Sequence, residues 1–354
     1  MRDRANNLHD AAIVRLNAQI HPVTPYELAA YERYGLSPIL VEARTPAELI
    51  PNVAQADAVF AVSVALPAPV IQAMARCRVI SRMGTGVDKI DVATATQNGI
   101  VVTNVPYFCV EEQADHTMAL LLSLVRKLPQ MSNILRNGQW SQARSLMQTH
   151  QRLVGRVLGL VGFGNSAMAT ARRARGFGMR VMATRRNLET ARRSATEIGV
   201  ELVSLDTLLA ESDYVSLHLP LNAETYHLFD AATLHKMKPG AILINTSRGA
   251  LVDEPALAAA LREGRLAGAG IDTFEVIDVF GSPEGPPDHP FLALENVVLT
   301  PHVAAGSVQA MQDVVTGAIE NVVAVLTGSW PDPVHIVNRG VQPRYPLTAQ
   351  ELPD

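Results

Sequence analysis

The sequence of 354 residues lacks most of the features that mark secreted, membrane-embedded or nucleic-acid-binding proteins. It contains only two cysteines, Cys77 and Cys109, which excludes a disulfide framework and fits a reducing compartment. Its formal net charge of −4 provides no basic field for nucleic acid or an anionic membrane. The longest apolar run, residues 118–125, is far too short to span a bilayer, and the amino terminus has no apolar segment typical of a signal peptide. These absences predict a cytoplasmic globular protein with neither nucleic acid nor membrane as a partner.

What the sequence does contain is enough apolar residues for more than one core. Hydrophobic types make up 48% of the chain and charged types 18%, which is ordinary for an α/β protein, and the length favours two domains. Strand-like and helix-like segments alternate over residues 11–103, which predicts a parallel, doubly wound sheet. The strands are expected at 12–16, 38–41, 58–64 and 79–82, and the helices at 25–34, 46–50 and 67–75.

A long helix is expected over residues 110–128. His116 lies within it, where a histidine is more often a packed or capping residue than a catalyst. Residues 138–152 are polar and show no clear periodicity. They are predicted to form a linker, or an arm that reaches toward a partner subunit.

A glycine-rich turn organises the second half of the chain. A strand-like run at 158–161 leads into this turn, and a helical pattern follows it, which is the order a dinucleotide fold needs. Glycines permit the tight turn and the close approach of a pyrophosphate, while free N–H groups at the helix start bind the phosphate. The residues expected to bind cofactor here are Gly162, Phe163, Gly164, Asn165 and Ser166, and the small Ala167 lets the helix pack on its strand.

The next strand, expected at 179–183, ends in Thr184, Arg185 and Arg186. An NAD site has an Asp or Glu near this point that binds the ribose hydroxyls, whereas the first acid here is Glu189. Two guanidinium groups favour the additional phosphate of NADP. The predicted cofactor is therefore NADP(H), with NAD(H) possible.

Three further strands, expected at 241–245, 267–271 and 297–300, are each followed by a polar residue: Arg248, Asp272 and His302. Polar side chains at several strand ends around one dinucleotide turn indicate a catalytic site. An earlier glycine-rich turn follows the strand at 79–82. There Arg82 and the backbone N–H groups of Thr85 and Gly86 could bind a carboxylate, although an ordinary loop with a surface arginine fits the residues equally well.

Seven segments of the chain, in order, resemble the D-isomer-specific 2-hydroxyacid dehydrogenases, a family that includes glyoxylate/hydroxypyruvate reductases and phosphoglycerate dehydrogenase. They cover nearly the whole chain: MGTGVDKID (83–91), TNVPYFCVEEQADHT (103–117), VGFGNSAM (161–168), LHLPLNAETYHL (217–228), INTSRGALVDEPAL (244–257), AGAGID (267–272) and LTPHVA (299–304). The resemblance implies an α/β fold in which a Rossmann cofactor domain (105–303) is inserted into a flavodoxin-like substrate domain (1–104 with 304–354). It also implies a homodimer built through the cofactor domains.

The same resemblance implies roles for individual residues. Arg248 is expected to hold the carboxylate and oxo group of the substrate, His302 to act as the acid–base group, and Asp272 to orient the nicotinamide carboxamide. The loop at 84–86 is expected to bind the carboxylate through backbone N–H groups. The remaining residues expected to contact cofactor are Leu219, Pro220, Thr225, Thr246 and Ser247. No metal is expected.

The chain departs from the family pattern in three places. Arg185 occupies the position of the ribose-binding acid, and residues 60–64 lack the cation that would bind a phosphorylated substrate. The family also has a Glu five residues after the strand-end Asp, where this chain has Ile277. Counting back about nineteen residues from His302 leads to Pro283, and the adjacent Glu284 is the predicted partner of His302, with Glu275 as the second choice and Asp278 also available.

These observations predict an oxidoreductase that transfers hydride between NADP(H) and a small, unphosphorylated 2-oxo acid or D-2-hydroxy acid. The alternative is a dinucleotide-sensing, peptide-binding protein, because two segments also resemble the eukaryotic C-terminal-binding corepressors on the same fold. Those proteins keep the ribose-binding acid, which this chain lacks, so the enzyme is favoured. The preferred 2-oxo acid is not readable, because side-chain pockets built from loops vary within a family.

Overall fold

The computed structural model describes residues 8, 10–277, 279 and 288–348. The chain divides into two compact units, one comprising Met1–Phe108 with Ser307–Asp354 and the other comprising Cys109–Gly306. The sequence analysis places the two boundaries after residues 104 and 303.

The first unit is built on a five-stranded sheet in which every neighbouring pair is parallel. Its strand order, β2-β1-β3-β4-β5, is that of flavodoxin-like folds, with the change of direction between β1 and β3. The strands are β1 (Ile13–Leu16), β2 (Ile39–Val41), β3 (Ala58–Ala61), β4 (Val79–Arg82) and β5 (Val101–Thr103). The helices are α2 (Pro25–Arg33), α3 (Pro46–Val53), α4 (Ala68–Gln72), α5 (Val92–Gln97) and α14 (Val308–Leu326).

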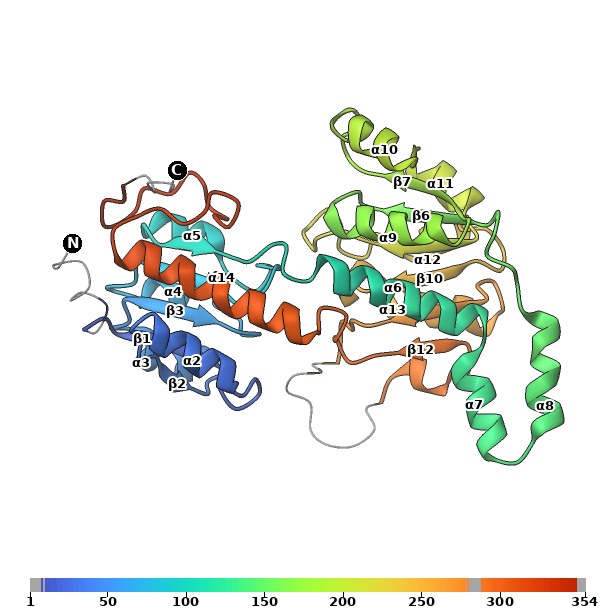
Figure 1. Ribbon diagram of the computed structural model, residues 1–354, viewed down its shortest axis with the longest axis horizontal. Helices are drawn as coiled ribbons and strands as arrows, with labels where there is room; N and C mark the ends of the chain where they lie inside the picture. The colour runs from blue at the N-terminus through green and yellow to red at the C-terminus, as the bar shows by residue number, and fades with distance from the viewer. Residues whose placement is uncertain (1–7, 9, 278, 280–287, 349–354) are drawn as a thin grey trace. The chain divides into compact units, whose positions relative to one another are not determined.

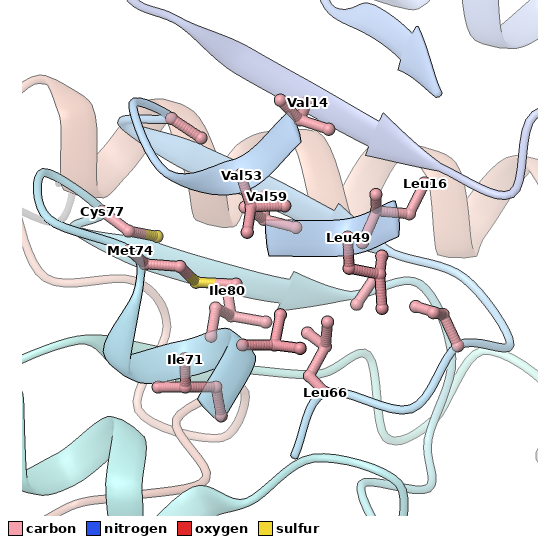
Figure 2. Close-up of a cluster of buried hydrophobic side chains, with 14 of the residues drawn as sticks. Val14, Leu16, Leu49, Val53, Val59, Leu66, Ile71, Met74, Cys77 and Ile80 are labelled. Carbon is pink, nitrogen blue, oxygen red and sulfur yellow. The ribbon is translucent and has the colours of Figure 1, made fainter. Parts of the chain in front are cut away.

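Both faces of this sheet are covered, which explains the continuous apolar runs of its strands. On one face, Leu16, Val59 and Ile80 pack among residues of α3 and α4, as Figure 2 shows. On the other face, Phe60 packs in a cluster that includes Val315. The C-terminal helix α14 therefore closes the core of the first unit.

The second unit is built on a seven-stranded parallel sheet of order β12-β11-β10-β9-β6-β7-β8. Counted within the unit, this is the 3-2-1-4-5-6 order of dinucleotide-binding folds with one further strand. The two parallel α/β sheets confirm the predicted fold class. The strands are β6 (Val157–Val161), β7 (Arg180–Thr184), β8 (Glu201–Leu202), β9 (Tyr214–Leu217), β10 (Ile242–Asn245), β11 (Gly268–Ile271) and β12 (Val297–Leu299).

Most helices of the second unit lie around this sheet, while the pair within residues 128–145 projects away from it (Figure 1). They are α6 (Val110–Val125), α7 (Leu128–Arg136), α8 (Trp140–Ser145), α9 (Asn165–Gly176), α10 (Arg192–Ile198), α11 (Leu205–Glu211), α12 (Ala231–Lys236) and α13 (Glu254–Arg262). The described residues of this unit also form short 3₁₀ helices: η1 (Leu146–Thr149), η2 (Glu189–Ala191), η3 (Gly249–Leu251) and η4 (Pro290–Ala293).

Two sequence-based expectations for the second unit differ in part from the structure. The predicted helix over 110–128 is present as α6 but ends at Val125, because Lys127 adopts a left-handed conformation (φ 51°) and α7 begins at Leu128. Residues 138–152, predicted as a linker or arm without periodicity, contain α8 and η1. These are too short to show a helical repeat in the sequence.

Candidate active site

The glycine turn after β6 is shaped by a close approach of backbone. Gly162 has φ 97°, and a Cβ added there would lie 2.3 Å from the carbonyl oxygen of His218. Only glycine fits both constraints. At Gly164, which precedes α9, an added Cβ would meet nothing within 4 Å. Among the described residues, no side chain caps the start of α9. Its first N–H groups therefore fit the phosphates of a dinucleotide.

His218 ties this turn to the end of β9. Its Nδ1 lies 3.1 Å from Ser166 Oγ, and its Nε2 lies 3.0 Å from Ser216 Oγ. Burial lowers the pKa of His218 to about 4, so the ring is neutral at neutral pH. The sequence analysis included His218 only within the segment LHLP and assigned it no role.

The arginines that follow β7 are both exposed. Arg186 forms an ion pair with Glu224. Arg185 makes no hydrogen bond or ion pair within the part of the chain that the structure describes. β7 is the neighbour of β6, so these cations follow the strand next to the glycine turn.

Four further residues expected to contact cofactor lie in the core or in a surface loop. Phe163 is buried in the core, so only its backbone could contact a ligand. Pro220 and Thr225 belong to one surface loop, in which Thr225 Oγ1 donates a hydrogen bond to the carbonyl oxygen of Pro220 (2.7 Å), and Leu219 is half-buried.

The turn that carries Arg248 is held by its own hydrogen bonds. Asn245 Oδ1 accepts from the N–H of Ser247 (3.0 Å), and Asn245 Nδ2 donates to the carbonyl oxygen of Arg248 (2.8 Å). Gly249 packs directly on the next loop, since an added Cβ would lie 2.0 Å from the carbonyl carbon of Phe274. Arg248 is half-buried and donates from Nη1 to the carbonyl oxygen of Ser247 (2.7 Å).

Asp272 is fully buried and organises the turn around His302. Its carboxylate accepts hydrogen bonds from Thr300 Oγ1 (2.6 Å) and from the N–H groups of Val303 (2.9 Å) and Ala304 (3.0 Å). Its carbonyl oxygen accepts from the N–H of His302 (2.7 Å). Burial opposes ionisation of Asp272, but these hydrogen bonds and one from the helix α6 hold its pKa below the usual value.

His302 itself has φ 57°, a left-handed conformation that is costly for a residue other than glycine. The turn is held by Asp272, which accepts from the N–H of His302 and from the N–H groups of Val303 and Ala304 that follow it. The strands before Arg248, Asp272 and His302 are neighbours in register, with Asn245 opposite Ile271 and Ile271 opposite Leu299. The sheet therefore brings the ends of these three strands together.

Of the three acids predicted as possible partners of His302, Glu275 lies within the described residues. Glu284 and Asp278 lie outside the described residues. The carboxylate of Glu275 accepts from Tyr226 Oη (3.0 Å) and lies 2.8 Å from His227 Nε2. Glu275 is thus already engaged by a neighbouring loop.

In the first unit, Arg82 binds its own loop. Its Nε donates to the carbonyl oxygen of Gly86 (3.1 Å), and its Nη1 donates to that of Met83. Gly84 (φ 145°) makes room for the guanidinium, because an added Cβ would lie 2.8 Å from Nη1. Thr85 is exposed and Gly86 is half-buried. Arg82 therefore shapes the loop from which the Thr85 and Gly86 N–H groups could bind an anion.

Helix α6 contributes side chains to this site that the sequence alone did not indicate. Gln113 Nε2 donates to the carbonyl oxygen of Thr246 (3.0 Å), and the hydroxyls of Thr117 and Thr246 lie 3.1 Å apart. His116 contacts Thr300 and Asp272, although the sequence analysis treated it as a packed or capping residue. No local signal distinguishes these residues, because their partners lie more than a hundred residues away.

Comparison with known proteins identifies the relatives of this chain. A family model described as D-isomer specific 2-hydroxyacid dehydrogenase, NAD binding domain, matches residues 118–304. A glyoxylate reductase of Korarchaeum cryptofilum is 42% identical over 279 residues, which cover 78% of this chain and 80% of the relative.

Two solved structures are similar over almost the whole chain. One is an NADPH-dependent glyoxylate/hydroxypyruvate reductase from Sinorhizobium meliloti in complex with NADP and malonate (28% identity, TM-score 0.78, 96% of this chain and 100% of that one). The other is D-lactate dehydrogenase from Aquifex aeolicus with NAD and lactic acid (27% identity, TM-score 0.82, 92% and 98%).

Two kinds of feature are absent from the part of the chain that the structure describes. No helix among the described residues is long and apolar enough to cross a membrane. Over the same residues, no three His, Cys, Asp or Glu side chains are grouped so that they could hold a metal ion.

Proposed function

This chain belongs to the D-isomer-specific 2-hydroxyacid dehydrogenase family and is an NAD(P)-dependent dehydrogenase, and we propose that it transfers hydride between NADP(H) and a small, unphosphorylated 2-oxo acid of the glyoxylate or hydroxypyruvate type. The observation that carries the proposal is the set of neighbouring strands β10, β11 and β12, which are followed by Arg248, Asp272 and His302. The family match and the glyoxylate reductase relatives favour this enzyme over the corepressor-like alternative.

The chemistry requires two groups from the protein. The bound dinucleotide supplies the hydride, and negative charge develops on the carbonyl oxygen of the substrate. Arg248 would stabilise that charge with a fixed guanidinium held by its turn. His302 would donate a proton to the same oxygen, because an imidazole can be charged near neutral pH.

We assign cofactor binding to the unit of residues 109–306 and substrate binding to the other unit. Backbone N–H groups at 162–166 would hold the phosphates, with Leu219, Pro220, Thr225, Thr246 and Ser247 as further contacts. Arg185, with Arg186 beside it, would bind the 2′-phosphate of NADP, which supports preference for NADP(H) over NAD(H). The similar structures include one with NADP and one with NAD, so the proposed cofactor preference of this chain rests on Arg185 and Arg186.

For the substrate, we propose that the N–H groups of Thr85 and Gly86 bind the carboxylate in a loop that Arg82 holds in shape. The end of β3 continues into Val62, Ser63 and Val64, which carry no positive charge. A phosphorylated substrate is therefore not expected.

Two roles near His302 are also proposals. Glu284 is the proposed partner of His302, since Glu275 is engaged by Tyr226 and His227. Contact between Asp272 and the nicotinamide carboxamide stays a prediction, while the hydrogen bonds of Asp272 support a role in holding the turn of His302.

We also propose that the protein is a homodimer assembled through α7 and α8. Figure 1 shows these helices side by side, projecting away from the seven-stranded sheet. Within α7 no residue is buried, and the large apolar side chains of Leu128, Trp140 and Met147 are all exposed, Trp140 by 71%. A second copy of the chain would cover them.

The proposed function is tested by following NADPH absorbance at fixed NADPH while glyoxylate, hydroxypyruvate and pyruvate are added in turn. We expect oxidation of NADPH with at least one of them, and much slower oxidation with 3-phosphohydroxypyruvate. An enzyme that oxidises NADPH with none of the three, although NADPH binds, would contradict the proposed substrate class.

A further inference from the structure

Helix α6 directs three polar side chains toward the carboxyl ends of the strands that precede Arg248, Asp272 and His302. Residues three and four apart share one face of a helix, so Gln113, His116 and Thr117 point the same way. Gln113 and Thr117 contact Thr246, which follows β10. The contacts of His116 lie farther along the sheet, at Thr300 and Asp272.

The hydrogen bonds around Thr300 determine which way the proton of His116 points. Thr300 Oγ1 lies 2.6 Å from Asp272 Oδ1, and the only hydrogen of the hydroxyl is donated to that carboxylate. The same hydroxyl oxygen lies 2.9 Å from His116 Nε2, so it accepts a hydrogen bond there and Nε2 carries a proton. His116 Nε2 is also 3.5 Å from Asp272 Oδ1.

This arrangement extends through Asp272 to His302. Asp272 Oδ1 accepts from the N–H of Val303, and the carbonyl oxygen of Asp272 accepts from the N–H of His302. His302 is left-handed without being glycine, and these hydrogen bonds hold the backbone of its turn. His116 thus stabilises the carboxylate that holds the turn.

Packing alone does not account for His116. Its side chain is 22% exposed rather than fully buried in the core. The imidazole instead directs Nε2 at two oxygens of one hydrogen-bond network, and both belong to residues that hold the turn of His302.

We propose that His116 is a positioning residue for His302. It donates a hydrogen bond from Nε2 to Thr300, completes the hydrogen-bond set of the Asp272 carboxylate, and so keeps the His302 turn in its left-handed conformation. The inference rests on the proposed function, because it takes His302 as the acid–base group.

Four variants test the proposal by activity. His116→Phe fills the space without a donor, His116→Gln keeps an N–H donor, and Thr300→Val removes the hydroxyl and keeps the shape. His235→Phe is the matched control, since His235 is exposed on α12 in the same unit. We expect His116→Phe and Thr300→Val each to lower kcat about 10- to 100-fold, as small misplacements of a reacting group do. NADPH binding should stay near that of the parent, and His116→Gln should recover much of the loss.

The double variant His116→Phe with Thr300→Val supplies a further readout. Residues that act through one chain of hydrogen bonds are not additive, so the double variant should be no slower than the slower single variant. Losses that multiply, or a loss in His116→Gln as large as in His116→Phe, would overturn the proposal. If His116→Phe does not fold, His116→Gln and Thr300→Val carry the comparison.

A measurement without turnover separates this inference from the proposed function. The ring signals of His302 are followed by NMR in protein labelled with ¹⁵N-histidine, and they are identified by their loss in His302→Gln. We expect His116→Phe and Thr300→Val to shift these signals, and His235→Phe to leave them in place. If the parent reduces no 2-oxo acid but the signals shift, the proposed function fails and the coupling of His116 to His302 stands. Unchanged signals in both variants would overturn the coupling, whatever the activity.

Discussion

Each of the two units contains a glycine-rich turn directly after a parallel strand, but the two turns are built differently. In the second unit, the turn at 162–164 leads to the uncapped start of α9, and an added Cβ at Gly164 would meet open space. In the first unit, the guanidinium of Arg82 occupies the space in front of Gly84 and binds the loop carbonyl oxygens. A glycine-rich turn is therefore not a phosphate site in itself, because the group that fills the space beside it decides its use.

The two arginines at strand ends differ in the same way. Arg82 ends β4 and donates to carbonyl oxygens of the loop that it stabilises. Arg248 follows β10, and the turn that carries it is held by Asn245 and by the packing of Gly249. Arg82 donates to two carbonyl oxygens of its loop, whereas the turn of Arg248 is held by Asn245 and Gly249 as well as by the hydrogen bond of Arg248 to Ser247.

The largest expected effect separates these two arginines. Arg248→Ala should lose about 2.7–4 kcal/mol of transition-state stabilisation, the contribution of one oxyanion donor. Arg248→Lys should recover little, because an ammonium does not make the bidentate contact of a guanidinium. Steady-state kinetics and NADPH binding are compared for both variants, with Arg82→Ala as the counterpart. Arg82→Ala should raise KM for the 2-oxo acid and lower the free energy of unfolding. A near-normal kcat/KM in Arg248→Ala would mean that Arg248 has no part in the mechanism.

The next effect concerns the cofactor side of the second unit. Each charge-assisted hydrogen bond to the 2′-phosphate should contribute about 1.5–3 kcal/mol, so Arg185→Asp should weaken or reverse the preference for NADPH. The ratio of kcat/KM for NADPH and NADH measures this directly. Arg193→Asp, on the exposed surface of α10, is the control with the same change of charge. Equal kcat/KM for both cofactors in the parent would refute the assignment.

The two glycine turns themselves are compared by Gly162→Ala and Gly84→Ala. Both glycines have positive φ, but the new Cβ would meet the backbone carbonyl of His218 in one case and the end of the Arg82 side chain in the other. Gly162→Ala should cost about 1–3 kcal/mol of unfolding free energy and abolish NADPH binding. Gly84→Ala should cost less, because a flexible side chain can move. Equal losses in chemical denaturation would contradict the difference between the turns.

A smaller effect is expected on the free energy of unfolding at acidic pH, and it comes from His218 in the second unit. The pKa of His218 falls from 6.5 to about 4 in the folded protein, so between these pH values the unfolded chain binds a proton that the folded chain does not. Stability should therefore fall as pH decreases through this window, by about 1.4 kcal/mol per pH unit from this residue. Unfolding free energies of the parent and His218→Gln are compared at pH 7, 6 and 5. A difference between the two proteins that does not change with pH would contradict the burial of a neutral ring.

The smallest effect identifies the carboxylate partner of His302. A neighbouring carboxylate favours the charged imidazole, so removing it should make reductase activity decline at lower pH on the alkaline side. The measurement is kcat/KM against pH for Glu284→Gln and Glu275→Gln. We expect a shift in Glu284→Gln alone. A shift in Glu275→Gln alone would reverse the assignment, and no shift in either would mean that His302 works without a carboxylate.

Much of the architecture was predictable because its causes are local. Alternating apolar segments of strand and helix length determine a parallel α/β fold, and Thr24 caps α2 as the residue type predicts, accepting from the N–H of Glu27. The strand-end positions of Arg248, Asp272 and His302 followed from counting along the chain. By contrast, the end of α6 at Val125 depends on the left-handed Lys127, which no residue preference indicates.

What the sequence by itself determined is which residue types stand at the ends of which strands, since that depends only on the order of the chain. The tertiary structure alone decided what each of those side chains contacts. Parallel strands are joined through helices, so the partners of a strand-end residue come from distant segments: His116 meets Thr300 across 184 residues, and Gly162 meets the carbonyl of His218. Such contacts leave no periodicity or spacing in the sequence, because they depend on how α6 packs on the sheet and how β9 pairs with β6, not on neighbouring residues.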